Sequence, residues 1–145
     1  MTTDTILLIG SISAGKTTLS QRLNDSSVAY AKTQAIEALG NIVDTPGEYF
    51  DHGRFWSALQ VSANSVDKVL LLVDPTAPET RMPPGIAGTF SRPVLGVVTK
   101  ADEASEEQIE DAYQTLRQGG AEDIFVTDAV TGRGISALRE SLWPS

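Results

Sequence analysis

The sequence predicts an α/β fold with three layers: an open, mostly parallel sheet of six strands with helices on both faces. Apolar runs of strand length alternate along the chain with segments of helical periodicity. The two longest runs are continuous rather than alternating, which is typical of strands covered on both faces. Strands that alternate with helices pair in parallel through crossover connections. The length of 145 residues indicates one domain over residues 1–145.

The expected strands are short apolar runs bounded by turn residues or charged residues. They cover 5–9, 34–37, 41–44, 68–74, 93–99 and 124–126, of which the second and third form a weak pair. The expected helices cover 16–23, 55–65, a segment that begins at Ser105, and a last segment with an apolar stripe from Ile135 to Leu142. Ser105 and Gln108 form a capping-box pattern, and Gly119 and Gly120 end that helix.

The segment between the strands 68–74 and 93–99 breaks the alternation, because prolines and glycines stand where a crossover helix is expected. They are Pro75, Pro78, Pro83, Pro84, Gly85 and Gly88. Proline lacks an N–H and clashes with the preceding turn of a helix. We therefore predict a proline-rich irregular loop or at most one helical turn, with either this loop or a partner covering that part of the sheet.

The composition excludes several classes of protein. Nineteen acidic against eleven basic residues give a net charge of −8, which argues against a nucleic-acid or anionic-membrane binder. The absence of cysteine excludes disulfides, thiolate metal sites and cysteine nucleophiles. The apolar runs are too short to span a membrane, and the first residues lack a secretory signal pattern. We expect a cytoplasmic protein.

Residues 10–17 read GSISAGKT and match the phosphate-loop pattern G-x-x-x-x-G-K-[ST] in full. The match follows an expected strand and opens an expected helix, which is the context that the motif requires. The backbone N–H groups of such a loop point inward, so the predicted phosphate-binding residues are Gly10, Ser13, Ala14, Gly15, Lys16, Thr17 and Thr18. Lys16 would reach the β- and γ-phosphates, and the Thr17 hydroxyl would bind Mg²⁺.

A second candidate site follows the expected strand 41–44, where the sequence reads Asp44-Thr45-Pro46-Gly47. An acidic residue at the carboxyl end of a strand beside a phosphate loop can hold Mg²⁺ through water. The N–H of Gly47 would then be available to a γ-phosphate. The alternative is a plain type II turn after a strand.

A third candidate site is Thr99-Lys100-Ala101-Asp102, at the carboxyl end of the strand 93–99. A carboxylate there can accept two hydrogen bonds from the N1–H and exocyclic amine of guanine. Adenine has no such pair of donors, so Asp102 would select guanine. The alternative is an acidic flank for the helix that begins at Ser105, and both can hold.

The three motifs, with residues 128–135 (DAVTGRGI), resemble the ordered motif set of small GTPase-fold proteins, especially the Era-like group. Residues 32–37 (KTQAIE), 44–49 (DTPGEY) and 92–96 (RPVLG) resemble the EutP/PduV family more specifically. Proteins of that family are encoded with bacterial ethanolamine- and propanediol-utilisation systems, whose enzymes work inside protein-shelled microcompartments. The resemblance runs from about Ile6 to Leu142.

The resemblance implies further roles. Thr33 would bind Mg²⁺ when a triphosphate is bound, beside Thr17 and Asp44. Thr99, Lys100 and Asp102 would frame guanine, and the backbone N–H of Ala129 would bond the base oxygen.

Several positions depart from the family pattern. Glu48 stands where many GTPases carry the glutamine that orients water, so Glu48 and Lys16 are the candidate catalytic residues. A surface or switch-locking role for Glu48 is the alternative. Asp128 stands where the last motif usually has serine. Ile12 would obstruct an arginine finger, so we expect hydrolysis at roughly 10⁻⁴ to 10⁻² per second without a partner.

The sequence suggests no functional role for the arginines near these motifs. Arg54, Arg81 and Arg133 are each expected to be free surface residues.

The function expected first is Mg²⁺-dependent binding of GTP or GDP, with ATP left open, and slow or partner-stimulated GTP hydrolysis in ethanolamine or propanediol utilisation. The protein partner would be a shell or enzyme protein of a microcompartment, and the oligomeric state stays open. A small-molecule phosphotransferase and a nucleotide-bound interaction module with little catalysis are the alternatives.

Overall fold

The computed structural model describes residues 4–10, 15–25, 42–44, 56–77 and 82–143. The strands are β1 (Ile6–Ile9), β2 (Ile42–Asp44), β3 (Lys68–Val73), β4 (Val94–Val98) and β5 (Ile124–Val126). The helices are α1 (Lys16–Asp25), α4 (Trp56–Ala63), α5 (Glu106–Gly119) and α6 (Ile135–Leu142). Two short 3₁₀ helices, η2 (Ile86–Thr89) and η3 (Ala101–Glu103), flank β4. Each of these elements lies within one or two residues of its expected position where the sequence predicted one.

The sheet has the strand order β2-β1-β3-β4-β5, and all four pairings are parallel. In the register, Ile6 of β1 lies between Ile42 of β2 and Lys68 of β3. The predicted α/β fold is confirmed, but the described sheet has five strands rather than six. The further strand expected over 34–37 lies outside the described residues. Because every strand runs the same way, all carboxyl ends meet at one edge of the sheet.

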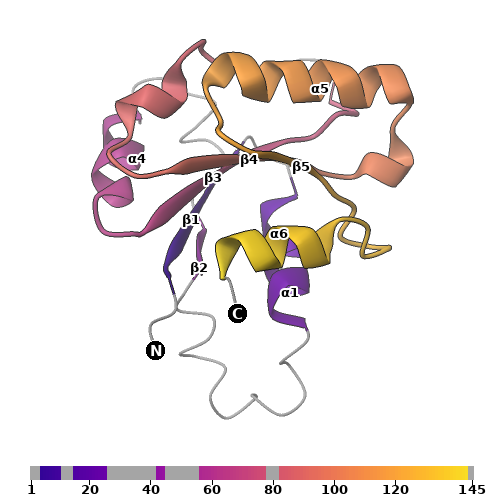
Figure 1. Cartoon of the computed structure of the whole chain (residues 1–145), viewed down its shortest axis with the longest axis horizontal. Helices are drawn as coiled ribbons and strands as arrows, with labels where there is room; N and C mark the ends of the chain where they lie inside the picture. Colours follow the sequence, from indigo (N-terminus) through magenta and orange to yellow (C-terminus); the bar gives the residue numbers. More distant parts are fainter. Residues whose placement is uncertain (1–3, 11–14, 26–41, 45–55, 78–81, 144–145) are drawn as a thin grey trace.

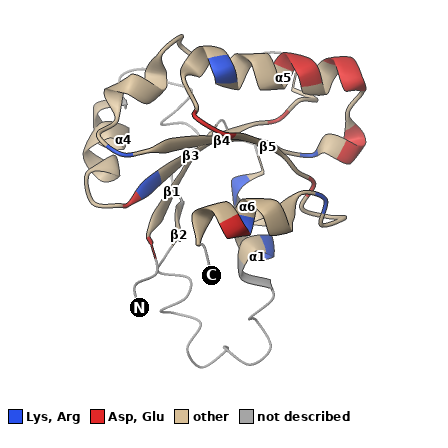
Figure 2. Cartoon of the chain, viewed as in Figure 1, with Lys and Arg blue, Asp and Glu red and all other residues tan. Residues whose placement is uncertain are grey.

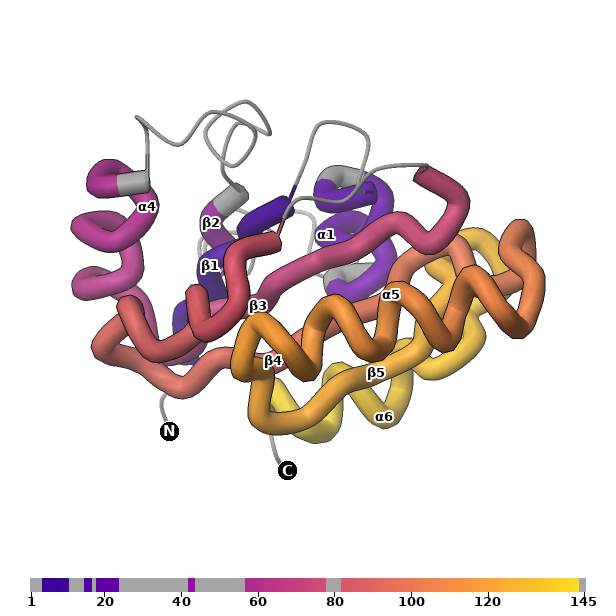
Figure 3. Tube along the Cα trace, turned by 90° about the horizontal axis from the view of Figure 1, so that it is seen from above, coloured from indigo at the N-terminus to yellow at the C-terminus, as the bar shows by residue number. Residues whose placement is uncertain are grey.

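Helices cover both faces of the sheet, with α4 and α5 on one side and α1 and α6 on the other (Figure 1). Alternate residues of β1 face opposite layers: Leu7 and Ile9 pack toward α4 and α5, and Ile6 and Leu8 toward α1 and α6. Viewed from above, α4 and α5 lie toward opposite ends of the sheet (Figure 3), with α4 on β1 and α5 on β3, β4 and β5. The continuous apolar runs of the sequence follow from this double burial.

The proline-rich segment contributes its own cover to the α4–α5 face. Its described part contains one 3₁₀ turn, η2, as the prolines predicted, and no α-helix. Ile86, Ala87 and Phe90 are buried in the same core as Leu116 of α5, and Met82 packs against that core. The N–H of Gly85 donates to the carbonyl of Gln118 at the end of α5 (2.8 Å). The described part of the loop therefore packs over this part of the face.

Helix α5 begins as predicted. The Ser105 hydroxyl accepts from the Gln108 N–H (3.1 Å), and the Gln108 side chain accepts from the Ser105 N–H (2.9 Å), which completes the capping box. Glu106 and Glu107 lie in the first turn, where the helix dipole favours negative charge. Figure 2 shows acidic residues concentrated at this end of α5.

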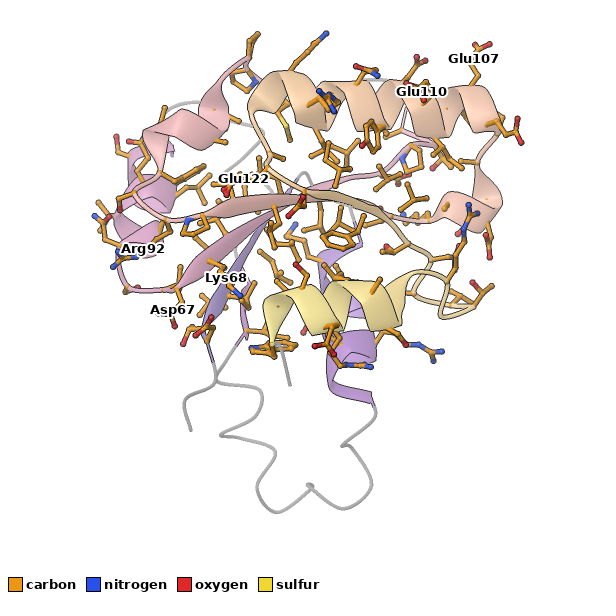
Figure 4. All side chains as sticks on the ribbon, viewed as in Figure 1. Asp67, Lys68, Arg92, Glu107, Glu110 and Glu122 are labelled. Carbon is orange, nitrogen blue, oxygen red and sulfur yellow. The ribbon has the colours of Figure 1, made fainter. Side chains whose placement is uncertain are left out.

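Basic side chains near the amino ends of β3 and β4 have structural partners. The Lys68 ammonium donates to the carbonyls of Ser141 and Leu142 at the end of α6, and the Arg92 guanidinium donates to the carbonyls of Asn64 and Val66 after α4. Figure 4 labels Lys68 and Arg92 at this side of the molecule, away from Glu107 on α5. Cations suit the negative carboxyl ends of helices. Over the described ranges, no helix is long and apolar enough to cross a membrane.

Candidate nucleotide site

The phosphate loop connects the carboxyl end of β1 to the first turn of α1. Lys16 is only 8% exposed, and its ammonium donates to the carbonyl of Gly10 (3.0 Å). This bond connects the end of β1 to the start of α1. Residues 11–14, which include the predicted Ser13 and Ala14, lie outside the described residues.

Gly15 shows why this loop needs glycine at its last position. Its φ is +97°, in the left-handed region that side chains disfavour. A Cβ at Gly15 would meet Thr99 at 3.7 Å, an ordinary contact distance. Backbone conformation, rather than lack of space, therefore selects glycine here. The Gly15 carbonyl accepts from the N–H of Leu19 (2.9 Å) and starts the helix.

The predicted magnesium ligands Thr17 and Asp44 belong to elements that meet at this edge. Thr17 is in the first turn of α1, and Asp44 ends β2 opposite Leu8 of β1. A hydroxyl and a carboxylate are the oxygen ligands that Mg²⁺ prefers, so the residue types fit the ion. The side chains of Thr17 and Asp44, and the whole of Thr33, Gly47 and Glu48, lie outside the description. Their metal, phosphate and catalytic roles stay predictions.

A cavity of about 200 Å³ lies beside the phosphate loop. Residues from α1, from the loop after β4 and from the loop after β5 line it: Gly15, Thr18, Leu19, Thr99, Lys100, Glu103, Thr127, Asp128, Ala129 and Val130. The structure thus brings three of the four predicted base-binding residues, Thr99, Lys100 and Ala129, next to the predicted phosphate-binding residues Gly15 and Thr18. The fourth, Asp102, does not line the cavity.

Asp128 joins the two loops that border the cavity. Its carboxylate is buried, with the residue 2% exposed. One oxygen accepts from the Asp102 N–H (3.0 Å), and the other accepts from the N–H groups of Val130 (2.9 Å) and Thr131 (3.1 Å). An aspartate in place of the usual serine therefore fixes the loop after β5 to the loop after β4.

The Asp102 carboxylate points toward the loop 131–133. One oxygen accepts from the Thr131 hydroxyl (2.7 Å), and the other accepts from the Arg133 guanidinium (3.0 Å). These two hydrogen bonds, that from Thr131 first, lower the pKa of the Asp102 carboxyl below its ordinary value. The expectation that Arg133 is a free surface residue is therefore wrong. No pattern in the sequence signals this pair, which joins residues 31 positions apart.

A second ion pair that the sequence did not predict lies at the end of β3. The Lys100 ammonium donates to the Asp74 carboxylate (3.0 Å), which also accepts from the N–H and hydroxyl of Thr76 (2.8 and 2.6 Å). Burial alone would raise the pKa of Asp74, but the bonds from Thr76 and Lys100 outweigh this effect and hold the pKa below its ordinary value. The sequence offers one signal for a role of Asp74: like Asp44, it is an acidic residue at the carboxyl end of an expected strand.

Acid is expected to remove the stability that Asp74 provides. Because its pKa is lower in the folded chain than in the unfolded chain, the contribution is complete above about pH 4 and falls as the pH drops through the folded pKa. Asp74→Asn should lower the free energy of unfolding by about 2 kcal/mol at neutral pH, and by less near pH 3. Urea denaturation at both pH values measures this. Asp111→Asn, at an exposed carboxylate, should change stability by less than about 0.5 kcal/mol. A deficit for Asp74→Asn that does not shrink in acid would contradict the prediction.

A larger cavity of about 350 Å³ lies on the other side of this ion pair. It lies between the end of β3 and helix α5, lined by Val73, Asp74, Pro75, Thr76, Ala77, Gln108, Asp111, Ala112 and Thr115. Asp74 lines this cavity and Lys100 lines the smaller one, so the ion pair connects the walls of both.

The comparisons with known proteins assign this chain to a family. The model of the family described as "Ethanolamine utilisation - propanediol utilisation" matches residues 3–143. The chain belongs to this family. "Propanediol utilization protein PduV" of Citrobacter freundii is 40% identical to it over 133 residues, which are 92% of this chain and 89% of that protein. "Probable acetate kinase EutP" of Escherichia coli K12 is 32% identical over 140 residues, which are 94% of this chain and 87% of that protein.

Solved structures support the same fold for this family member. The FeoB G-domain of Methanococcus jannaschii superposes with a TM-score of 0.65 and 22% sequence identity, covering 98% of this chain and 96% of that one. At this identity the likeness shows the fold alone, an open α/β sheet of the G-domain type. The resemblance to the ethanolamine- and propanediol-utilisation family is thus confirmed, along with the fold that it implied.

Proposed function

We propose that this chain binds a guanine nucleotide with Mg²⁺ and hydrolyses GTP slowly or with the help of a protein partner, in the service of ethanolamine or propanediol utilisation. One observation carries the proposal. The 200 Å³ cavity is lined both by the phosphate-loop residues Gly15 and Thr18 and by Thr99, Lys100 and Ala129. A base in this cavity would therefore lie next to a loop suited to its phosphates.

The proposed roles follow from the chemistry of each residue. Lys16 supplies the positive charge at the phosphate loop, and Thr17, Thr33 and Asp44 supply oxygens to Mg²⁺. Asp102 accepts from the guanine N1–H and amine once its carboxylate faces the base. Glu48 is the candidate for orienting water, and Ile12 disfavours an inserted arginine. Hydrolysis without a partner would therefore be slow.

Asp102→Asn is expected to abolish a preference for guanine over adenine. An amide presents one acceptor and one donor, so it cannot accept both guanine hydrogen bonds. Calorimetric titration of the Mg²⁺-loaded, nucleotide-stripped protein with GDP, a GTP analogue and an ATP analogue measures the preference. We expect a loss of about tenfold or more in GDP affinity and no change for the ATP analogue. Glu103→Gln, at a carboxylate that lines the same cavity, is the matched control and should keep the preference. Equal or tighter binding of the ATP analogue by the unaltered chain would overturn the guanine assignment.

A second candidate function is phosphoryl transfer from a nucleotide to a small molecule. Two findings favour it: a relative carries the name "Probable acetate kinase EutP", and the 350 Å³ cavity provides space at the same edge of the sheet. In such a step the bond between the γ-phosphorus and the bridging oxygen breaks, an acceptor oxygen bonds the phosphorus, and the nucleoside diphosphate leaves; a hydroxyl acceptor also releases its proton to solvent. Asp74 is already paired with Lys100, so it is the exposed Asp111 carboxylate in the cavity that favours a neutral or cationic acceptor over acetate.

Phosphorus NMR distinguishes the two functions. The protein is incubated with Mg²⁺-GTP or Mg²⁺-ATP and, separately, with acetate or ethanolamine. A phosphorylated acceptor would establish the transferase, whereas release of inorganic phosphate alone, unchanged by either acceptor, would support hydrolysis.

A further inference from the structure

The group that would identify guanine already has partners within the chain. Each oxygen of the Asp102 carboxylate accepts one hydrogen bond from the loop after β5, from Thr131 on one side and Arg133 on the other. The carboxylate faces that loop rather than the cavity that Thr99, Lys100 and Ala129 line. A base in the cavity would therefore meet Asp102 in the wrong orientation.

We propose that Arg133 is a specificity-determining residue that holds the Asp102 carboxylate away from the base cavity, so that guanine must displace Arg133 in order to bind. The inference rests on the proposed guanine site and deepens it. Guanine needs both carboxylate oxygens turned toward its N1–H and amine, and a carboxylate paired with Arg133 does not offer them in that direction. Adenine lacks the pair of donors that would bind this carboxylate, so the ion pair between Arg133 and Asp102 lowers affinity for guanine nucleotides alone.

The positions of the side chains make displacement feasible. The Arg133 and Asp102 side chains are 52% and 37% exposed, so both can turn into solvent without leaving a buried charge. The backbone of the loop does not have to move with them, because Asp128 anchors the N–H groups of Asp102, Val130 and Thr131 independently. The Arg133 and Asp102 side chains can therefore separate while the backbone of the loop stays in place.

The size of the effect follows from this exposure. Exposed ion pairs are weak, so removing the guanidinium should raise GDP affinity by about two- to fivefold and leave ADP affinity unchanged. Salt provides an independent measure. Higher ionic strength screens the pair, so the ratio of GDP to ADP affinity should rise with salt in the unaltered chain. The phosphate contacts are the same for GDP and ADP and cancel in this ratio.

The test measures GDP and ADP dissociation constants by calorimetry at low and high salt for the unaltered chain, Arg133→Ala and Arg133→Gln. Glutamine keeps most of the side-chain length without the charge, so a result shared by both variants reports the loss of charge. Arg117→Ala, at an exposed arginine on α5, is the matched control and should behave as the unaltered chain does. Thr131→Val removes the other hydrogen bond and should also raise GDP affinity. In both Arg133 variants the salt dependence of the GDP-to-ADP ratio should vanish.

Three results would overturn the inference. A fall in GDP affinity in the Arg133 variants would mean that the arginine positions the carboxylate for the base. Equal changes for GDP and ADP would mean that it only supports the loop, and an unchanged ratio would mean that it has no influence. If Asp102→Asn still abolishes guanine preference, the proposed function survives these results. If the unaltered chain binds neither nucleotide, the proposed function and this inference fail together.

Discussion

Replacing Lys16 is expected to abolish nucleotide binding almost entirely. Its ammonium is the buried positive charge at the phosphate loop, and a phosphate would replace the Gly10 carbonyl as its partner. Charge-assisted hydrogen bonds to phosphate are strong, so Lys16→Ala should weaken GDP and ADP binding alike, by about 100-fold or more. Calorimetry or a fluorescent nucleotide analogue measures this loss. Equal loss for both nucleotides is expected because phosphates are common to them.

Two further variants separate the lost charge from lost packing. Lys16→Met keeps an apolar stem in the buried position and should show the same loss as Lys16→Ala. Lys68→Met removes a lysine at the far side of the sheet, where the ammonium binds the end of α6, and should leave nucleotide affinity unchanged. Retained binding in Lys16→Met would contradict the assignment of residues 10–17 as the phosphate site.

Asp128→Ala is expected to be the most destabilising single change near the base cavity. The substitution removes the acceptor of three backbone N–H groups, those of Asp102, Val130 and Thr131, at a buried position. The expected loss in the free energy of unfolding is about 3 kcal/mol. Because the two loops would then separate, GDP affinity should fall as well. Urea denaturation and calorimetry measure the two effects on the same protein.

Two substitutions define this role further. Asp128→Ser introduces the residue usual in the motif. The serine hydroxyl can accept from only some of the three N–H groups, so we expect an intermediate loss in the free energy of unfolding. Asp123→Ala, at an exposed aspartate before β5, should change stability by less than about 0.5 kcal/mol. A stable Asp128→Ala variant with unchanged GDP affinity would show that the loops hold together without this carboxylate.

Most of the fold could be predicted because its signals are local or periodic. A strand covered on both faces must be apolar throughout, so β3 and β4 appear as continuous runs. The start of α5 depends on two side chains three residues apart, which the sequence displays directly. The parallel arrangement then brings the ends of β1, β3, β4 and β5 to one edge, where Thr99, Lys100 and Ala129 meet Gly15.

The contacts of the charged groups could not be predicted, because they depend on loop geometry. Arg133 reaches Asp102 only because the loop after β5 folds back, with Gly132 and Gly134 in left-handed conformations and an antiparallel bridge between Asp128 and Arg133. Likewise, the pairing of Lys100 with Asp74 depends on a positive φ of 54° at Lys100 itself. No spacing or periodicity in the sequence encodes such turns. Charged residues that the sequence suggests are free on the surface can therefore form ion pairs with residues of a site.

The wholly parallel pairing of the described strands also governs how the chain reaches its native state. A parallel pair cannot form through a tight turn, and the connection from β4 to β5 contains the whole of α5, 14 residues long. Each strand pairing therefore requires closure of a long loop. The loss of chain entropy on closure comes before the hydrogen bonds and the buried surface of the strand pair can offset it. We expect helices such as α5 to gain structure early and the sheet to form late and cooperatively. The phosphate loop and the base cavity, which exist only where several strands end together, would then acquire binding competence in the last step of folding.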